Sequence, residues 1–288
     1  MTHIQVEQPI LELKDIVFSY TETRKASQNK PLLNIEKLIL YPNDKVGIIG
    51  DNGSGKSTIV RIILGLHIPK GTVNLFGRKV LWGNHYSSLG YIGDPSFSPG
   101  YTGLPTGISV REVVDSFKAI CKIKKETFSD IEEQLNFDNF LNKDVKNLSN
   151  GERKKLMIFL ALAKRPNLLI ADEATDGLDE KSKCFVIEKI KQISATSKLG
   201  ILWISHQHHE VAMLTDTVYE LIEGQLKAPT HKRFNCKIET YPKTSVNGSY
   251  QNISSKGWLE VAAKIYTNPV ISNFEIKGMR AQGEDERS

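Results

Sequence analysis

Residues 50–57 read G-D-N-G-S-G-K-S and match the phosphate-binding pattern G-x-x-x-x-G-K-[ST]. Glycines in such a loop let consecutive backbone N–H groups curl around phosphate oxygens, and the helix that follows points its positive end at the same anion. Lys56 would reach the terminal phosphates, and the Ser57 hydroxyl would bind Mg²⁺. The loop follows a short apolar segment, residues 45–49, which is typical of a buried strand. These residues predict a triphosphate-binding site.

Two acidic residues, Asp172 and Glu173, end a second apolar segment that reads L-L-I-A-D-E. In a triphosphate site, Asp172 would hold Mg²⁺ through water, and Glu173 would accept a proton from the water that attacks the terminal phosphate. Alone, such a pair is more often a strand that runs into an acidic turn. The phosphate-binding pattern earlier in the chain favours the catalytic interpretation.

Two further segments have both a structural and a functional interpretation. Residues 148–152 read L-S-N-G-E, so Ser149 could begin a phosphate-contacting helix or simply cap one, with Glu152 in its first turn. His206 follows an apolar segment, and taken alone it would be an ordinary histidine at a strand end. His208 and His209 lack a cysteine or acid pair that would complete a metal cluster, so we expect them to be solvated.

The elements that would position these residues alternate along the chain. Short apolar strands alternating with amphipathic helices predict a parallel sheet wrapped by helices. Strands are expected at residues 10–20, 32–41, 45–49, 72–76, 79–82, 168–171 and 201–204. Helices are expected at residues 57–66, 109–141, 151–164 and 181–194, and a helical piece at 258–266.

The order of the motifs resembles an ATP-binding cassette (ABC) ATPase. Five motifs follow one another in the order found in that family: the phosphate loop, L-S-x-G-E, an apolar strand with Asp-Glu, D-G-L-D at residues 176–179, and I-S-H at 204–206. The resemblance covers about residues 10–226 and implies an α/β P-loop NTPase fold of ABC type. Such a fold has a RecA-like parallel-sheet core, an antiparallel β subdomain and a helical subdomain, here followed by a short C-terminal extension.

The resemblance also implies a role for each matching residue. Tyr20 stands where the family places an aromatic ring that stacks on adenine, Asp172 matches the Mg²⁺-organising aspartate, Glu173 the catalytic base and His206 the switch histidine. The ATP-binding residues of the phosphate loop would be Gly50, Asp51, Asn52, Gly53, Ser54, Gly55, Lys56, Ser57 and Thr58. The signature motif would be Ser149, Asn150 and Gly151, and Asp179 would end the D-loop.

Several positions depart from the family pattern. Asp94 stands where the family has a glutamine that reaches Mg²⁺; a carboxylate could still do so, but it cannot donate a hydrogen bond as an amide does. Asn150 replaces a glycine of the signature, and Ala174 replaces a proline. Residues 21–30 lengthen the gap between Tyr20 and the phosphate loop. The departures bear on rate and coupling to a partner rather than on ATP binding.

Composition narrows the possible classes of protein. The chain has 288 residues with 40% hydrophobic residues, enough to bury a core, and its longest apolar run is far shorter than the roughly 18 residues that span a bilayer. The N-terminus lacks the pattern of a signal peptide, and three scattered cysteines form neither a metal pair nor a disulfide framework.

Residues 227–288 hold ten basic and six acidic residues, so they carry +4 of the net charge of +5. The catalytic region is therefore nearly neutral, and nucleic acid is not expected as a partner.

These observations lead to one principal interpretation. We expect a cassette at residues 8–226, with a helical subdomain at about 95–165, and a partly ordered extension at 227–288. By the resemblance, two cassettes, here a homodimer, would close head to tail around ATP, hydrolyse it and drive a separate transmembrane permease from the cytoplasmic face of the membrane. The chain itself would be cytoplasmic and peripherally attached through that permease.

Two alternatives stay open. A single cassette of this size also suits a soluble ATPase outside transport, for example of the iron–sulfur assembly type. Asp94 and Asn150 are compatible with a cassette that binds ATP as a switch and hydrolyses it slowly, although Glu173 and His206 argue against this. Neither the transported substrate nor the direction of transport can be read from an ATPase subunit.

Overall fold

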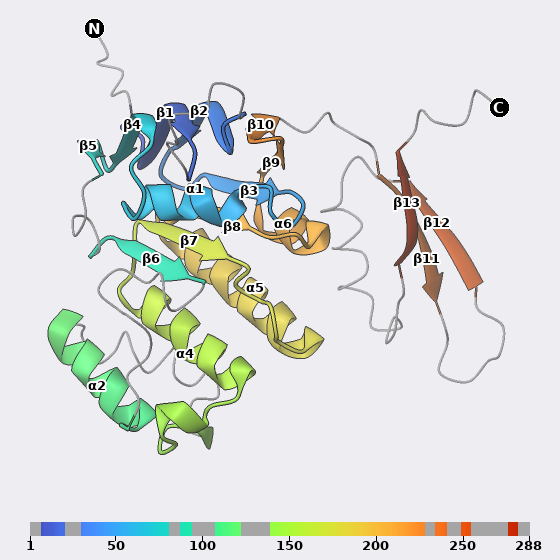
Figure 1. Cartoon of the computed structure of the whole chain (residues 1–288). Coiled ribbons are helices and arrows are strands. Elements are labelled where there is room, and N and C mark those ends of the chain that lie inside the picture. The colour runs from blue at the N-terminus through green and yellow to red at the C-terminus, as the bar shows by residue number, and fades with distance from the viewer. Residues whose placement is uncertain are drawn as a thin grey trace, which may run out of the picture.

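A six-stranded sheet with the strand order β10-β9-β3-β8-β7-β6 runs through the middle of the protein (Figure 1). All neighbouring strands are parallel except β10, which is antiparallel to β9. The strands are β3 (Lys45–Ile49), β6 (Leu89–Ile92), β7 (Leu168–Asp172), β8 (Gly200–Ile204), β9 (Thr217–Ile222) and β10 (Gln225–Lys227). This computed structural model describes residues 7–20, 30–80, 87–93, 107–121, 139–227, 234–240, 249–254 and 276–281.

The central strands are short and apolar because they are buried on both faces. Successive residues of β7 point alternately into two hydrophobic cores: Leu168 and Ile170 enter one core, and Leu169 and Ala171 the other. All four side chains are fully buried. The sheet therefore separates two cores, and each face requires a covering layer.

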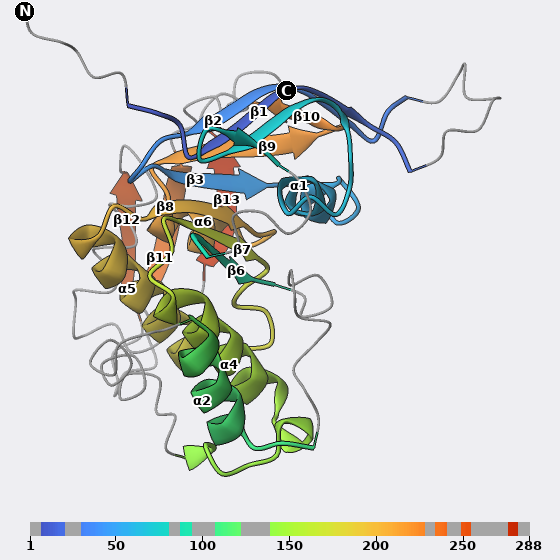
Figure 2. The same cartoon turned by 90° about the vertical axis from the view of Figure 1, so that its left-hand side faces the viewer.

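An antiparallel sheet and one helix cover the first face. The sheet has the strand order β2-β1-β4-β5, and α1 lies between it and the central sheet (Figures 1 and 2). Its strands are β1 (Leu11–Phe18), β2 (Leu33–Leu40), β4 (Lys70–Leu75) and β5 (Arg78–Lys79), and α1 spans Lys56–Ile63. Buried residues of α1, β1 and β2 share one core with β3, β7 and β8.

Helices cover the second face. Helix α4 (Asn150–Ala163) lies against the sheet with α5 (Glu180–Thr196), and α2 (Val110–Cys121) packs on the outer side of α4 (Figure 2). A short 3-10 helix, η3 (Val145–Asn147), precedes α4, and α6 (His208–Leu214) contacts β3 and β8. Within the described residues, no helix is both long and apolar enough to cross a membrane.

Most of the expected elements are confirmed to within a few residues. The helix expected at 109–141 is observed as α2; residues 141–144 are not helical, and 122–138 lie outside the described residues. The expected helical piece at 258–266 also lies outside them. In the C-terminal region, β11 (Phe234–Thr240), β12 (Ser249–Ser254) and β13 (Ile276–Ala281) form an antiparallel sheet of their own, with β11 in the middle.

Candidate nucleotide-binding site

The phosphate loop connects β3 to α1 in the conformation that its glycines allow. Gly53 and Gly55 have φ values of 83° and 106°, in the left-handed region that disfavours a Cβ atom. A Cβ on Gly55 would also lie only 2.8 Å from Leu33 Cδ2. Gly55 caps α1 without a side-chain hydrogen bond, so no capping side chain competes with an anion for the first N–H groups of the helix.

Lys56 lies along the inside of this loop and is only 7% exposed. Its Nζ donates hydrogen bonds to the carbonyl oxygens of Gly50 at 2.7 Å and Asp51 at 3.0 Å. Ser54 Oγ is buried and, among the described residues, has no hydrogen-bond partner. The loop therefore holds a buried ammonium group and, within the described residues, a hydroxyl without a partner, beside the N-terminus of α1, which suits a phosphate chain.

Three parallel strands bring the distant motifs to one edge of the sheet. Ile204 of β8 pairs with Ile48 of β3 on one side and with Asp172 of β7 on the other. The phosphate loop, the Asp172–Glu173 pair and His206 follow the ends of these three neighbouring strands. Ligands of parallel α/β sheets bind at this carboxyl edge, so the sheet assembles a single site from segments far apart in sequence.

Asp172 has the properties of a metal ligand. The residue is 8% exposed, and its Oδ1 has no hydrogen-bond partner within the described part of the chain. Burial raises the pKa of Asp172, and the nearby Ser57 hydroxyl opposes this rise. A buried carboxylate oxygen beside a hydroxyl provides the hard oxygen ligands that Mg²⁺ prefers, so these residues fit that ion.

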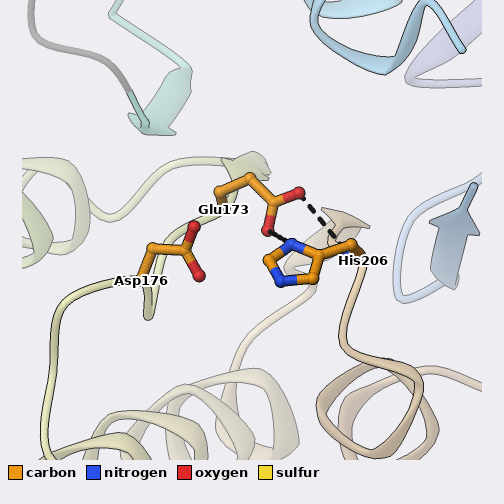
Figure 3. A group of neighbouring side chains, drawn as sticks. All are labelled: Glu173, Asp176 and His206. Atoms are coloured by element: carbon orange, nitrogen blue, oxygen red, sulfur yellow. Dashed lines mark hydrogen bonds and ion pairs between the residues drawn. The ribbon is translucent and has the colours of Figure 1, made fainter. Parts of the chain in front are cut away.

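Glu173 and His206 form the centre of the site (Figure 3). Nδ1 of His206 lies 2.9 Å from Oε2 of Glu173, and the His206 backbone N–H donates to Oε1 at 3.2 Å. Ser205 Oγ donates to Oε2 at 3.3 Å. Asp176 offers a further carboxylate, and ligand atoms of the three residues in Figure 3 all lie within 4.8 Å of one another. The carboxylate of Glu173 is thus fixed in a defined orientation at the edge of the sheet, as a general base requires.

The signature residues lie elsewhere on the surface. Ser149 caps α4 in a reciprocal capping box with Glu152, and Asp179 caps α5 by accepting a bond from the Ser182 N–H at 3.0 Å. Ser149, Asn150 and Asp179 are exposed. Among the described residues, no hydrogen bond or ion pair joins these three to the phosphate loop of the same chain.

Tyr20 lies beside the phosphate loop. Its hydroxyl is 3.0 Å from Thr58 Oγ1 and accepts a hydrogen bond from Arg61 at 2.9 Å. Its ring stands nearly perpendicular to the rings of Phe18 and His67, and 54% of the residue remains exposed. An aromatic ring that is anchored at its hydroxyl end and more than half exposed is suited to stacking on a planar base.

Comparison with known proteins identifies the family. The family model described as "ABC transporter" matches residues 33–176, half of the chain. The chain belongs to the ABC transporter family. The ABC-type fold and the enzyme class, an ATPase, are therefore confirmed.

Proteins with similar sequences show which members of the family this chain resembles. The chain is 30% identical over 232 residues to an "Energy-coupling factor transporter ATP-binding protein EcfA1" of Mycoplasma mobile, covering 79% of this chain and 82% of that protein. It is 32% identical to the protein of the same name in Streptococcus pyogenes serotype M12, covering 76% and 78%. Its relatives in the ABC family thus include ATP-binding proteins of transporters.

Solved structures of ABC proteins have the same fold. An "ATP binding subunit of ABC transporter" superposes with a TM-score of 0.64 at 24% identity, covering 76% of this chain and 88% of that one. The cbiO1 protein of Clostridium perfringens, described as part of the ABC transporter complex cbiONQ, gives a TM-score of 0.61 at 22% identity, covering 77% and 88%.

The ABC motifs did not identify every residue that the structure brings to this site. Asp176 begins D-G-L-D and Ser205 lies within I-S-H, although the resemblance implies no role for either. Ser205 donates to Glu173, and Gln207, which directly follows His206, donates to Asp176. Lys154 reaches the Glu173 carbonyl from α4 without any motif to indicate it. Asp94, the expected additional Mg²⁺ ligand, lies outside the described residues.

Proposed function

We propose that this chain is the ATP-hydrolysing subunit of a transporter, which pairs head to tail with a second cassette around ATP and drives a separate membrane-spanning subunit. The observation that carries the proposal is the similarity, over most of the chain, to proteins named as energy-coupling factor transporter ATP-binding proteins. The arrangement of Lys56, Glu173 and His206 at one sheet edge is what hydrolysis of a triphosphate requires.

Binding would use the phosphate loop and Tyr20. Lys56 Nζ would exchange its bonds to Gly50 and Asp51 for phosphate oxygens, and Tyr20 would stack on the adenine. The backbone donors and hydroxyls of the loop would come from Gly50, Asp51, Asn52, Gly53, Ser54, Gly55, Ser57 and Thr58. Ser57 and Asp172 would hold Mg²⁺, which neutralises charge on the phosphates when bound, and Asp94 stays a predicted third ligand.

Glu173 would act as the general base in hydrolysis. Its carboxylate would accept a proton from the water that attacks the γ-phosphate, while Lys56 stabilises charge on the phosphate oxygens. The contacts from Ser205 and His206 hold the carboxylate in place, and His206 would itself reach the γ-phosphate. The products are ADP and inorganic phosphate.

The exposed position of the signature favours a two-chain site. Ser149, Asn150 and Gly151 begin α4 at the surface, where they would meet ATP held by Lys56 of a partner, and Asp179 would lie in the same interface. We propose a homodimer of cassettes spanning residues 8–226, with a helical subdomain at about 95–165 and an extension at 227–288. The dimer would sit on the cytoplasmic face of the membrane through its permease.

One substitution tests the head-to-tail site. Glu173→Gln keeps the shape of the side chain but removes the base, so hydrolysis should fall by about 10²-fold or more and ATP should remain bound. Size exclusion with light scattering should show an ATP-dependent dimer, and Glu188→Gln, at an exposed position of α5, should behave like the wild type. A Glu173→Gln protein that stays monomeric with ATP would contradict the model.

A second experiment tests the transport assignment. Affinity purification of the tagged chain from membranes of its own cells should recover a multi-span membrane protein. Recovery of soluble scaffold proteins in its place would favour the iron–sulfur assembly alternative. A wild-type protein that binds ATP tightly but barely turns it over, with or without membranes, would favour the switch alternative.

A further inference from the structure

Lys154 connects the signature helix to the catalytic segment of the same chain. It belongs to α4, and its Nζ donates a hydrogen bond to the backbone carbonyl oxygen of Glu173 at 2.9 Å. The two residues come from different elements, since Glu173 follows β7. The bond is partly buried, so solvent competes with it less than with a bond at the surface.

Glu173 has a backbone conformation that needs support. Its φ is 48°, in the left-handed region, which is unfavourable for a residue with a side chain. The Glu173 N–H donates to Ile204 O at 2.9 Å, and its carbonyl oxygen also accepts from Asp176 N at 3.2 Å. Lys154 therefore joins a set of bonds that fixes the peptide units on both sides of the Glu173 Cα atom. The direction of the carboxylate depends on that backbone.

We propose that Lys154 is a positioning residue for ATP hydrolysis, which holds the backbone of Glu173 so that its carboxylate faces the attacking water. The inference rests on the proposed role of Glu173 as the general base. Lys154 would not touch the reacting atoms, since it acts through the carbonyl oxygen of Glu173. Loss of its hydrogen bond should therefore change the rate of the chemical step more than the binding of ATP.

The position of Lys154 within α4 extends this role to communication between the two proposed sites. The helix begins at Asn150, directly after Ser149, and continues without a break to Ala163. Ser149 would contact the ATP of the partner, while Lys154, about one and a half turns later, contacts the base of its own site. If α4 shifts when Ser149 binds the ATP of the partner, the Lys154 ammonium group that donates to the Glu173 carbonyl oxygen would move with it.

The test compares three variants of Lys154 in the purified full-length protein. Lys154→Met keeps an unbranched side chain but cannot donate, whereas Lys154→Gln and Lys154→Arg retain N–H donors. We expect the kcat of the methionine variant to fall about tenfold or more, the KM for ATP to stay within about twofold, and at least one donor variant to keep more than half of the wild-type kcat. Lys189→Met, a partly buried lysine of α5, is the matched control and should keep wild-type kinetics.

A double variant separates positioning from a general structural effect. In a Glu173→Gln background, Lys154→Met should produce little further loss of hydrolysis, because both changes act through the same group. Equal losses in all three Lys154 variants, a rise in KM without a change in kcat, or a full additional loss in the Glu173→Gln background would each overturn the proposal. The donor variants test it even if the methionine variant fails to fold.

The outcome is also distinguishable from failure of the proposed function. If Glu173→Gln hydrolyses ATP normally, Glu173 is not the base and the function proposed above is wrong. If Glu173→Gln is inactive while Lys154→Met keeps full kcat, only the inference about Lys154 fails.

Discussion

The ammonium group of Lys183 lies 3.5 Å from the carboxylate of Glu210, whose side chain is only 1% exposed. The same carboxylate accepts a hydrogen bond from the Thr175 hydroxyl. Lys183 also donates to Gln207 at 3.0 Å, and Gln207 donates to Asp176 at 3.1 Å. This chain of contacts joins the loop after Glu173 to the segment after His206.

Breaking this buried pair should destabilise the protein. Burial alone would lower the pKa of Lys183, but Glu210 and Glu180 raise it above the usual value, so the amine is charged. In Glu210→Leu this charge loses its buried partner but keeps the exposed Glu180 at 3.3 Å, and we expect the free energy of unfolding in urea to fall by about 1–3 kcal/mol. Adding Lys183→Met should recover most of that loss, since apolar replacements of a buried pair are often tolerated. Equal losses in the single and double variants would contradict this interpretation.

Two roles of Ser149 can be separated by substitution. Ser149→Ala removes the cap of α4 and should cost about 1 kcal/mol of stability. Ser149→Asp keeps a cap acceptor, so its stability should be near that of the wild type, but it places a negative charge where the proposed partner ATP binds. Its steady-state rate of hydrolysis should fall about tenfold or more because like charges repel.

The start of α2 provides the control for this prediction. Ser109 and Glu112 form the same reciprocal pair of hydrogen bonds there. The Ser109 N–H donates to the Glu112 carboxylate at 2.7 Å, and the Glu112 N–H donates to Ser109 Oγ at 3.2 Å. Ser109→Asp should leave both stability and hydrolysis close to wild-type values. A Ser149→Asp protein that hydrolyses ATP at the wild-type rate would show that Ser149 only caps its helix.

The ionised form of Asp172 should lower the stability of the folded protein, although its proposed function requires that form. Because burial raises its pKa, ionisation of Asp172 is less favourable in the folded than in the unfolded protein. At low pH Asp172 is protonated in both states and does not lower the stability. As the pH rises through its folded pKa, ionisation becomes costly in the folded protein and stability is lost. Asp172→Asn should raise the midpoint of thermal unfolding at about pH 8, by about 2–4 °C per kcal/mol relieved, and abolish Mg²⁺-dependent hydrolysis.

The pH dependence is the decisive part of this prediction. The stabilisation by Asp172→Asn should shrink as the pH falls and disappear near pH 3, in scans without nucleotide or Mg²⁺. Asp216→Asn, at an exposed position, should show no such trend. A gain in stability that is the same at every pH would mean that ionisation of Asp172 is not its cause.

The sequence allowed prediction of those parts of the fold that depend on local pattern. The strand expected at 45–49 is β3, and the helix expected at 151–164 is α4, shifted by one residue. In contrast, β6 has only four residues, too few to show an alternation of apolar and polar residues. Helix α6 begins with the polar residues His208, His209 and Glu210, so its sequence does not indicate which side of the helix is buried.

The same limit applies to the site. Motifs with fixed spacing led to Lys56, Asp172, Glu173 and His206, which the structure brings to one sheet edge. The contacts of Lys154 and of Glu210 depend on how separate helices pack against the sheet. No local signal encodes such packing, so these residues could be found only from the three-dimensional arrangement.

The strand order has a consequence for biosynthesis. The neighbours of β3 are β8 and β9, and Lys45 pairs with Ile201, 156 positions later in the chain. During translation, β3 and the phosphate loop emerge early but have no neighbouring strand until β8 leaves the ribosome. Closing so long a loop is slow relative to forming local helices. The nascent chain should therefore gain affinity for nucleotide late and abruptly, and truncation before residue 200 should abolish it.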